Sequence, residues 1–208
     1  ASSLRGGARL MAALFRARPL IAVGYAIVLA ATLAGAFAPW LSPYDPVTAN
    51  PDAYLAPPGR AHWLGADNTG MDILTRILYA PRTDFVIAIA GAAASFAIGA
   101  PLGALVGFYE GRDRLRRAFA VAVMRTADVL QSFPVFVFAI ALVAVFGQGL
   151  PTIVLAIAFV NAPVYLRLMR SQVQSVRGMR YVEAAYVAGA SDLALLARHI
   201  VPNAIHVA

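Results

Sequence analysis

The residues best suited to a specific interaction form one polar stretch near the end of this 208-residue chain, EAAYVAGASDLALLARHIVPN at 183–203. The small side chains of Ala184, Ala185 and Gly189 would let another surface approach the backbone closely. Glu183 and Asp192 either pair with basic groups on that surface or stabilise their own helices, and both roles remain open. This stretch predicts docking rather than catalysis, with a loop packed on its own helix bundle as the alternative.

Two short helices joined by a tight turn would position these residues. Apolar side chains recur at near-helical spacing and give the segment one apolar side, at Val182, Tyr186, Leu193 and Leu196. Gly189 suits the left-handed end of a first helix, and Ser191 can cap a second. We therefore expect a helical hairpin over about 171–199, followed by a membrane span after Pro202.

The composition excludes several other kinds of chemistry. Hydrophobic residues make up 61% of the chain and charged residues 13%, against about 25% charged in soluble domains, which indicates a membrane protein. The net charge of +7 does not indicate nucleic-acid binding, because the arginines flank apolar runs and form no basic domain. The chain has no cysteine, and His62 has no ligand cluster around it, so no metal site is expected.

The first apolar run, 20–41, is long enough to cross a membrane. It is uncharged and covers about 33 Å at about 1.5 Å per residue, compared with a hydrocarbon core of about 30 Å. Ala36-Phe37-Ala38 resembles a signal-peptide cleavage site, but the run exceeds the ~7–15 residues of a signal core. We expect an uncleaved transmembrane helix over 19–41.

A second uncharged run, 85–109, carries a small residue at every fourth position: Gly91, Ser95, Gly99, Gly103 and Gly107. This spacing aligns the small residues along one side of a helix, where a second backbone can approach closely. We therefore expect a packing seam inside a helix bundle.

The uncharged stretch 129–166 is too long for one span, since a single helix of that length would measure about 57 Å. Glycines and a proline at 147–151 mark a turn. The turn separates a third span, 129–147, from a fourth, 151–168.

Two prolines and one polar residue stand out in these spans. Pro134 and Pro163 are expected to kink them. Asn161 is a candidate pathway-lining residue, although an interhelical hydrogen bond explains it equally well. A further apolar stretch begins near Ile200. We predict an all-α polytopic membrane bundle with about four complete spans and the start of a fifth, its core at 85–208.

Arginine placement predicts the orientation, because cytoplasmic flanks are enriched in basic residues. Four arginines lie within 1–18, five within 110–128 and five within 167–199, against three in the remaining connections. We expect these three segments to face the cytoplasm, and 42–84 and 148–150 to face outside.

The external segment reads as a loop followed by a helix. Residues 42–61 are rich in proline and turn formers. In HWLGADNTGMDILTRILYA, Asp67 or Asn68 can cap a helix, and Asp72 and Arg76 are spaced as an i,i+4 ion pair. The apolar side would comprise Ile73, Leu74, Ile77 and Leu78. An amphipathic helix on the membrane surface is expected.

Three motifs resemble bacterial ABC importer permeases. Glu183-Ala184-Ala185 followed by Gly189 matches the E-A-A-x-x-x-G signature, although His199 and Val201 depart from its I-x-L-P continuation. The external HWLGADNTGMDILTRILYA resembles the H-x-L-G-T-D-x-x-G-R-D-x-x-S-R segment of the dipeptide, oligopeptide and nickel subfamily, with substitutions at Ala66, Met71 and Thr75. SFPVFVFAIALVAVFG resembles the third span of the C-type subunit.

This resemblance implies a type I importer fold with six spans in the full protein. It implies a heterodimer with a second permease subunit, two ATP-binding subunits that bind ATP and Mg, an extracytoplasmic substrate-binding protein, and a place in the bacterial inner membrane. The chain lacks a GxxxxGK[ST] phosphate loop, so it is not itself the ATPase and needs no cofactor of its own. Peptides or related small solutes are the implied substrates.

Three other classes of membrane protein remain as alternatives. A secondary transporter or channel would need no ATPase partner, but would usually carry an intramembrane charge or a broken-helix ion site. A membrane enzyme would need convergent titratable residues, and the apolar runs 20–41, 85–109 and 129–166 contain no Asp, Glu, Arg or His. An interaction subunit without transport is the third.

Overall fold

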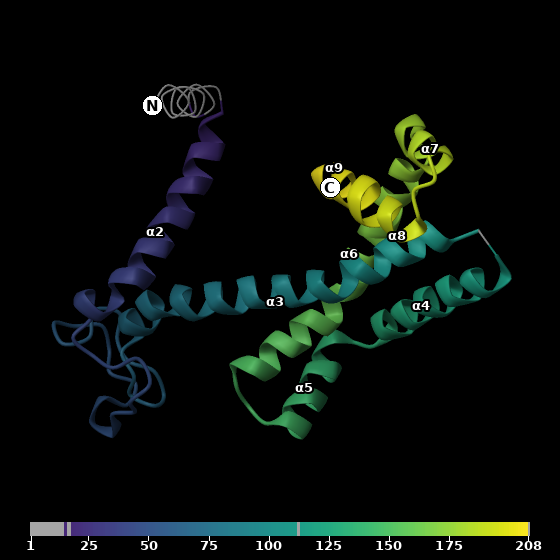
Figure 1. Cartoon of the computed structure of the whole chain (residues 1–208). Helices are drawn as coiled ribbons and strands as arrows, with labels where there is room; N and C mark the ends of the chain where they lie inside the picture. The colour runs from purple at the N-terminus through teal and green to yellow at the C-terminus, as the bar shows by residue number, and fades with distance from the viewer. Residues whose placement is uncertain (1–14, 16–17, 112, 208) are drawn as a thin grey trace. The chain divides into compact units, whose positions relative to one another are not determined.

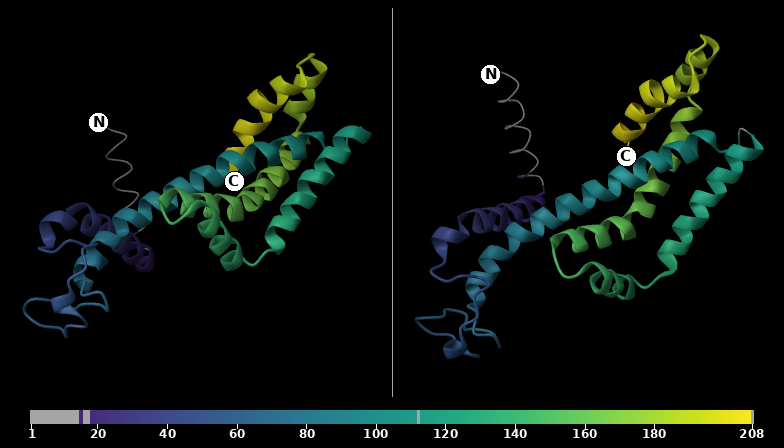
Figure 2. Two further views of the ribbon diagram at one scale, coloured as in Figure 1. Left: turned by 90° about the horizontal axis from the view of Figure 1, so that it is seen from below. Right: turned by 60° about the horizontal axis from the view of Figure 1, so that its bottom comes forward.

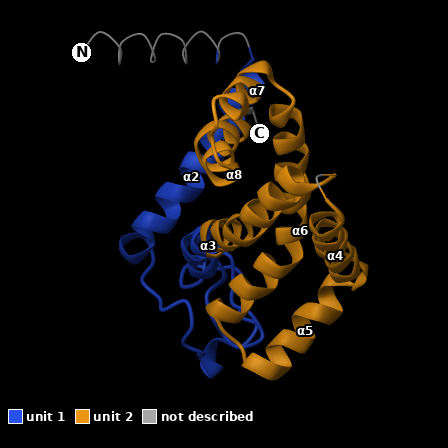
Figure 3. Cartoon of the chain, turned by 45° about the vertical axis from the view of Figure 1, so that its right-hand side comes forward, with its two compact units in different colours: residues 1–86 blue, residues 87–208 orange. Residues whose placement is uncertain are grey.

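The computed structural model describes residues 15, 18–111 and 113–207. Figure 1 shows their helices in chain order, and within this part the regular structure is helical apart from one β-bridge between Ala66 and Asp72. The chain forms two compact units, 1–86 and 87–208, coloured separately in Figure 3. The predicted all-α class is confirmed.

Helix α2 spans Pro19–Leu41 and begins with a proline, which fits the first helical position because its missing N–H has no intrahelical acceptor there. Its 23 residues measure about 35 Å. It is long and apolar enough to cross a membrane, as expected for this run. A short helix, η1 (Pro51–Ala53), interrupts the loop that follows.

Helix α3 spans Ile73–Tyr109, 37 residues without a break. The expected break between a helix near 73–80 and a span beginning at residue 85 is therefore absent from this helix. The charged segment 82–84 lies inside α3, which continues through Pro81. The helix is capped at its start by Asp72, whose Oδ1 accepts from the N–H and the hydroxyl of Thr75, both at 2.7 Å.

The kink expected at Pro134 in the third span is confirmed, and it divides the region into two helices. Helix α4 (Arg114–Ser132) and helix α5 (Val135–Phe146) meet at a bend of 91°, visible in Figures 1 and 2. Proline disfavours α-helical geometry in the residue before it, and Phe133, before Pro134, is extended at φ −74° and ψ 133°. Alone, the 12 residues of α5 reach about 18 Å, short of the ~30 Å core.

Helix α6 spans Leu150–Arg177 and runs through Pro163 unbroken. The predicted turn before it is confirmed, with Gly147 at φ 79° and Gly149 as the N-cap. The helix continues about nine residues beyond the predicted end of the fourth span. It therefore carries three arginines, Arg167, Arg170 and Arg177.

The predicted hairpin comprises helix α7 (Arg180–Val187), helix α8 (Asp192–Ala194) and the π-helix η2 (Leu195–Ile200), followed by helix α9 (Val201–Val207). In η2 the Val201 N–H donates to Leu196, five residues earlier. Pro202 follows directly, and a proline ring clashes with the carbonyl four residues before it in a regular α-helix. The wider π turn relieves that contact.

Three described helices are long and apolar enough to cross a membrane, or four if the bent α4–α5 pair is one span. This roughly matches the expected number. The core of the second unit joins α3 and α6 to the hairpin and α9. Its buried members are Ala100, Ala104, Phe108, Met169, Val173, Val176, Val182, Leu195, Leu196, Ile200 and Ala204.

Candidate functional site

The small-residue seam of α3 lies directly against the backbone of α6. A Cβ added at Gly99 would lie 2.3 Å from the Ala162 carbonyl oxygen, and one at Gly103 would lie 2.3 Å from that of Leu166. At Gly107 the nearest atom would be the Arg170 carbonyl oxygen, at 2.7 Å. Real Cβ atoms do not approach backbone this closely, so each glycine is required at its position.

The N-terminal part of the seam adds a hydrogen bond. Ser95 is fully buried, and its hydroxyl donates to the Gly91 carbonyl at 2.6 Å within α3. A Cβ at Gly91 would meet the Ile157 side chain of α6 at 2.6 Å. The structure therefore places all five seam residues at the α3–α6 contact.

The hairpin turns through a Schellman motif. Gly189 is left-handed at φ 87°, its N–H donates to Tyr186 at 3.0 Å, and the Ala190 N–H donates to Ala185 at 3.1 Å. This pattern satisfies the last carbonyls of α7 and fixes the turn. The predicted left-handed conformation is confirmed, as is the Ser191 cap, whose hydroxyl accepts from the Ala194 N–H at 3.3 Å.

The hairpin has one anchored side and one free side. Val182, Leu195 and Leu196 are buried in the core, and Ala185 packs partly against it. Glu183, Ala184 and Gly189 are exposed. Three large apolar side chains also face outward at the tip: Tyr186 is 61% exposed, Val187 80% and Leu193 72%. Exposed apolar residues of this size, grouped on one rigid element, mark an interaction surface.

The two acidic hairpin residues differ in their surroundings. The carboxylate of Asp192 lies 3.3 Å from Nη1 of Arg116 on α4, so within this chain it already has a basic partner. Glu183 lies in the first turn of α7, where its negative charge interacts favourably with the positive end of the helix dipole. Of the two roles considered, the contacts favour local stabilisation for Asp192.

A polar cluster absent from the sequence prediction joins α3 to α6. Glu110, directly after α3, receives hydrogen bonds from Arg170 Nε at 2.8 Å and Nη2 at 2.9 Å, and from Gln174 at 2.6 Å. The hydrogen bond from Arg170 lowers the pKa of Glu110 below its ordinary value, although partial burial opposes the shift. The carboxylate is therefore ionised at neutral pH.

Arg177 closes the end of α3. Its Nη1 donates to the carbonyl oxygens of Phe108 at 2.8 Å, Glu110 at 3.1 Å and Gly107 at 3.4 Å. These carbonyls belong to the last turn, where no intrahelical donor remains and the helix dipole is negative. The arginine excess after the fourth span is the one sequence signal related to this contact, and it predicts orientation but not the acceptor of Arg177.

Asn161 does not make an interhelical hydrogen bond in the described structure. Its Nδ2 donates to the Ile157 carbonyl within α6 at 3.1 Å. It lines a mostly apolar cavity of about 270 Å³ between α5 and α6, together with Thr152. A second charged contact lies on α6, where Arg167 Nη2 is 3.0 Å from Asp128 of α4.

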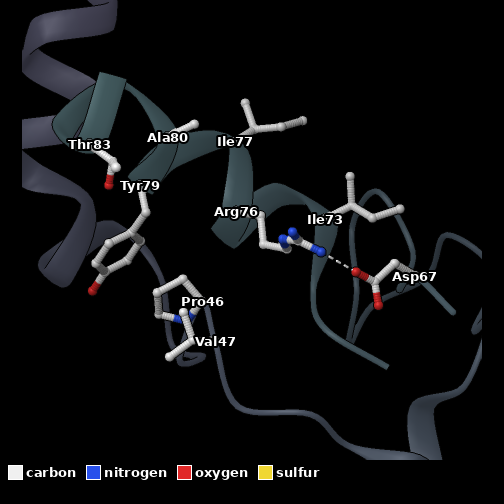
Figure 4. A pocket seen from close by; sticks show the side chains of 9 residues that line it. All are labelled: Pro46, Val47, Asp67, Ile73, Arg76, Ile77, Tyr79, Ala80 and Thr83. Atoms are coloured by element: carbon white, nitrogen blue, oxygen red, sulfur yellow. Dashed lines mark hydrogen bonds and ion pairs between the residues drawn. The ribbon is translucent and has the colours of Figure 1, made fainter. Parts of the chain in front are cut away.

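In the first unit, Asp67 organises the loop that precedes α3. Its Oδ1 accepts from the N–H of Thr69 at 2.8 Å and of Met71 at 3.1 Å, and from the Thr69 hydroxyl. The Thr69 hydroxyl and N–H are the main causes that lower the pKa of Asp67 to about 2. Arg76 pairs with Asp67, not with Asp72 as the i,i+4 spacing predicted. Figure 4 shows this pair at a cavity of about 550 Å³.

Asp72 instead links a chain of hydrogen bonds. Its Oδ2 lies 2.9 Å from Nδ1 of His62, and the Thr75 hydroxyl that donates to Asp72 is also 2.5 Å from the Ser42 hydroxyl. Burial alone would raise the pKa of Asp72, but hydrogen bonds from Thr75 and His62 outweigh it and the pKa is lowered. This chain of hydrogen bonds joins the end of α2 to the start of α3.

Comparison with known proteins gives two family matches. The family described as binding-protein-dependent transport system inner membrane component matches residues 99–208. The N-terminal transmembrane domain of oligopeptide transport permease C matches residues 9–58.

Individual relatives are similar along most of the chain. It is 37% identical over 191 residues to the glutathione transport system permease protein of Pectobacterium atrosepticum, covering 90% of this chain and 61% of that protein. It is 37% identical over 192 residues to the probable D,D-dipeptide transport system permease protein of Escherichia coli, covering 92% and 62%. For the oligopeptide transport system permease protein of Bacillus subtilis the identity is 35%, covering 92% and 61%. The chain thus spans about three fifths of their length.

Proposed function

Because the chain belongs to the family of binding-protein-dependent transport system inner membrane components, we propose that it is a permease subunit of an ATP-driven importer. It forms half of the translocation pathway and docks an ATP-binding subunit through the hairpin at 180–200. A second permease subunit supplies the other half, and an extracytoplasmic binding protein delivers the substrate. ATP and Mg are bound by the partner subunits.

The observation that carries this proposal is the two-sided hairpin. Its inner side is buried with α3 and α6, so a force on the hairpin reaches the membrane helices. Its outer side exposes Tyr186, Val187 and Leu193 around a turn fixed by Gly189. An apolar tip on a rigid base can form the apolar centre of an interface with an ATP-driven partner. The proposed orientation places this hairpin and residues 1–18 in the cytoplasm.

The substrate class follows from relatives named for the transport of glutathione, D,D-dipeptides and oligopeptides. We assign peptides or similar small solutes to this chain. The α5–α6 cavity beside Asn161 is mostly apolar, which suits a passage that leaves selection to the binding protein. Asn161 remains the proposed polar residue of that passage.

Reconstitution tests this function. The full-length protein, purified with its ATP-binding subunits and placed in liposomes, should import a labelled dipeptide only with ATP and the binding protein. Import driven by an ion gradient, with no ATP-binding subunit present, would instead identify a secondary transporter.

A further inference from the structure

Arg116, in the first turn of α4, contacts three separate parts of the second unit. Its Nη1 lies 3.3 Å from Asp192 Oδ2 of the hairpin. Its Nε lies 3.2 Å from Oδ2 of Asp113, the N-cap of α4. Its guanidinium carbon lies 4.6 Å from the centre of the Tyr109 ring at the end of α3. One side chain therefore joins the hairpin to the corner between α3 and α4.

The apolar core links the hairpin to α4 indirectly, through α6, against which α4 packs. The buried cluster that anchors the hairpin takes its described members from α3, α6, the hairpin and α9, and none from α4. The α4 end of the link is firmly held, because the Arg116 N–H also donates to Asp113 Oδ1 at 2.8 Å. The guanidinium is planar, so its bonds to Asp113 and Asp192 fix their relative direction.

We propose that Arg116 is a positioning residue that transmits movement of the hairpin to the α3–α4 corner, a role that rests on the proposed docking of the hairpin. When the ATP-binding subunit displaces the hairpin, Asp192 moves with α8 and draws the first turn of α4 with it. Tyr109 keeps the end of α3 in register through its contact with the same guanidinium. The α4–α5 pair then moves together with α3, so the two displacements are coupled.

A double-mutant cycle in the reconstituted full-length complex tests this role. The variants are Arg116→Gln, Asp192→Asn and the two combined, and the readout is the number of dipeptides imported per ATP hydrolysed. Each single variant should assemble with its partners and hydrolyse ATP, yet lower this ratio at least about fivefold, the lower range of coupling between sites. The combined variant should lose less than the two single losses together, because both changes remove the Arg116–Asp192 contact.

The matched control is Arg117→Gln, an exposed neighbour that should keep the wild-type ratio. An unchanged ratio in Arg116→Gln, or losses that add in the combined variant, would overturn the role of Arg116. A wild-type complex whose ATP hydrolysis does not respond to the binding protein would instead contradict the proposed function. The two failures are therefore distinguishable.

Discussion

Glu110 and Arg170 face each other through two parallel hydrogen bonds of 2.8 and 2.9 Å, one from each of two guanidinium nitrogens to a separate carboxylate oxygen. This two-pronged geometry ties the residue after α3 to α6 more specifically than a single contact could. Gln174 and Arg177 add bonds to the same corner. The end of α3 is thus fixed by side chains of α6, next to the point where the hairpin begins.

Replacing Glu110 with glutamine should lower stability modestly, by under about 1 kcal/mol, because the pair is partly exposed. The effect should depend on pH. The pKa of Glu110 is lowered from 4.5, so its stabilisation is complete above that value and is lost as the pH falls through the lower, folded pKa. Thermal unfolding in detergent should show a constant difference in melting temperature between wild type and variant from about pH 5 to 8. This difference should become smaller at lower pH. A difference that grows on acidification would contradict this assignment.

Gly103→Ala should destabilise the bundle. The new Cβ would lie 2.3 Å from the Leu166 carbonyl oxygen, so α3 and α6 must separate, at a typical cost of about 1–3 kcal/mol. Gly24→Ala in α2 is the matched control, because no atom lies within 4 Å of its Cβ position and alanine favours a helix by about 0.5–1 kcal/mol. Denaturant titration of both variants checks the contrast, and equal stabilities would exclude the close α3–α6 contact.

Asp72→Ala should loosen the start of α3. It removes the cap that accepts from Thr75, worth about 0.5–2 kcal/mol, and leaves the largely buried His62 without its carboxylate partner. Faster hydrogen exchange at the amides of 75–77 is the expected result. Asp52→Ala, at an exposed position, serves as the control and should leave those amides unchanged. Unaltered exchange in Asp72→Ala would mean that the cap is not formed.

Substitutions at Gly189 separate conformation from docking. At φ 87° leucine is strained, whereas asparagine tolerates the left-handed region, and open space surrounds the added Cβ. Gly189→Leu should insert in the membrane and abolish transport-coupled ATP hydrolysis. Gly189→Asn should keep the turn, yet also lose coupling if the glycine admits a partner surface. Normal coupling in the leucine variant would remove Gly189 from the docking site, and normal coupling in the asparagine variant alone would limit the residue to a conformational role.

Local sequence patterns were sufficient to predict the structural features that depend on residues close together in the sequence. The uncharged run at 20–41, the glycine turn before α6 and the Gly189–Ser191 turn all follow from spacing and backbone preference. The α3 seam also follows, because its four-residue period leaves one side of the helix without bulk.

The errors arose where two local signals compete. Asp67 and Asp72 can each cap a helix. Thr75, three residues after Asp72, is a local partner, whereas His62 is brought to Asp72 only by the folded loop. Arg76 then pairs with Asp67, across a turn that the i,i+4 rule does not consider. The charged segment 82–84 inside α3 also led to the prediction of two helices where the structure has one.

The ionic contacts could not be assigned from sequence at all. Glu110 and Arg170 are 60 residues apart, and Arg116 and Asp192 are 76 apart. An excess of arginine predicts which side of the membrane a segment faces, but not which carbonyl or carboxylate each side chain reaches.

Crosslinking from the hairpin tip tests the central claim most directly. The chain has no cysteine, so a single cysteine at Val187, which is 80% exposed, is a unique reporter, with Trp63 of the external loop as the matched control position. In membranes containing the whole complex, a cysteine at 187 should crosslink to an ATP-binding subunit in a nucleotide-dependent way, and one at 63 should not. A cysteine at 187 that reacts with a membrane-impermeant reagent from outside, or that never crosslinks to an ATP-binding subunit, would contradict the account.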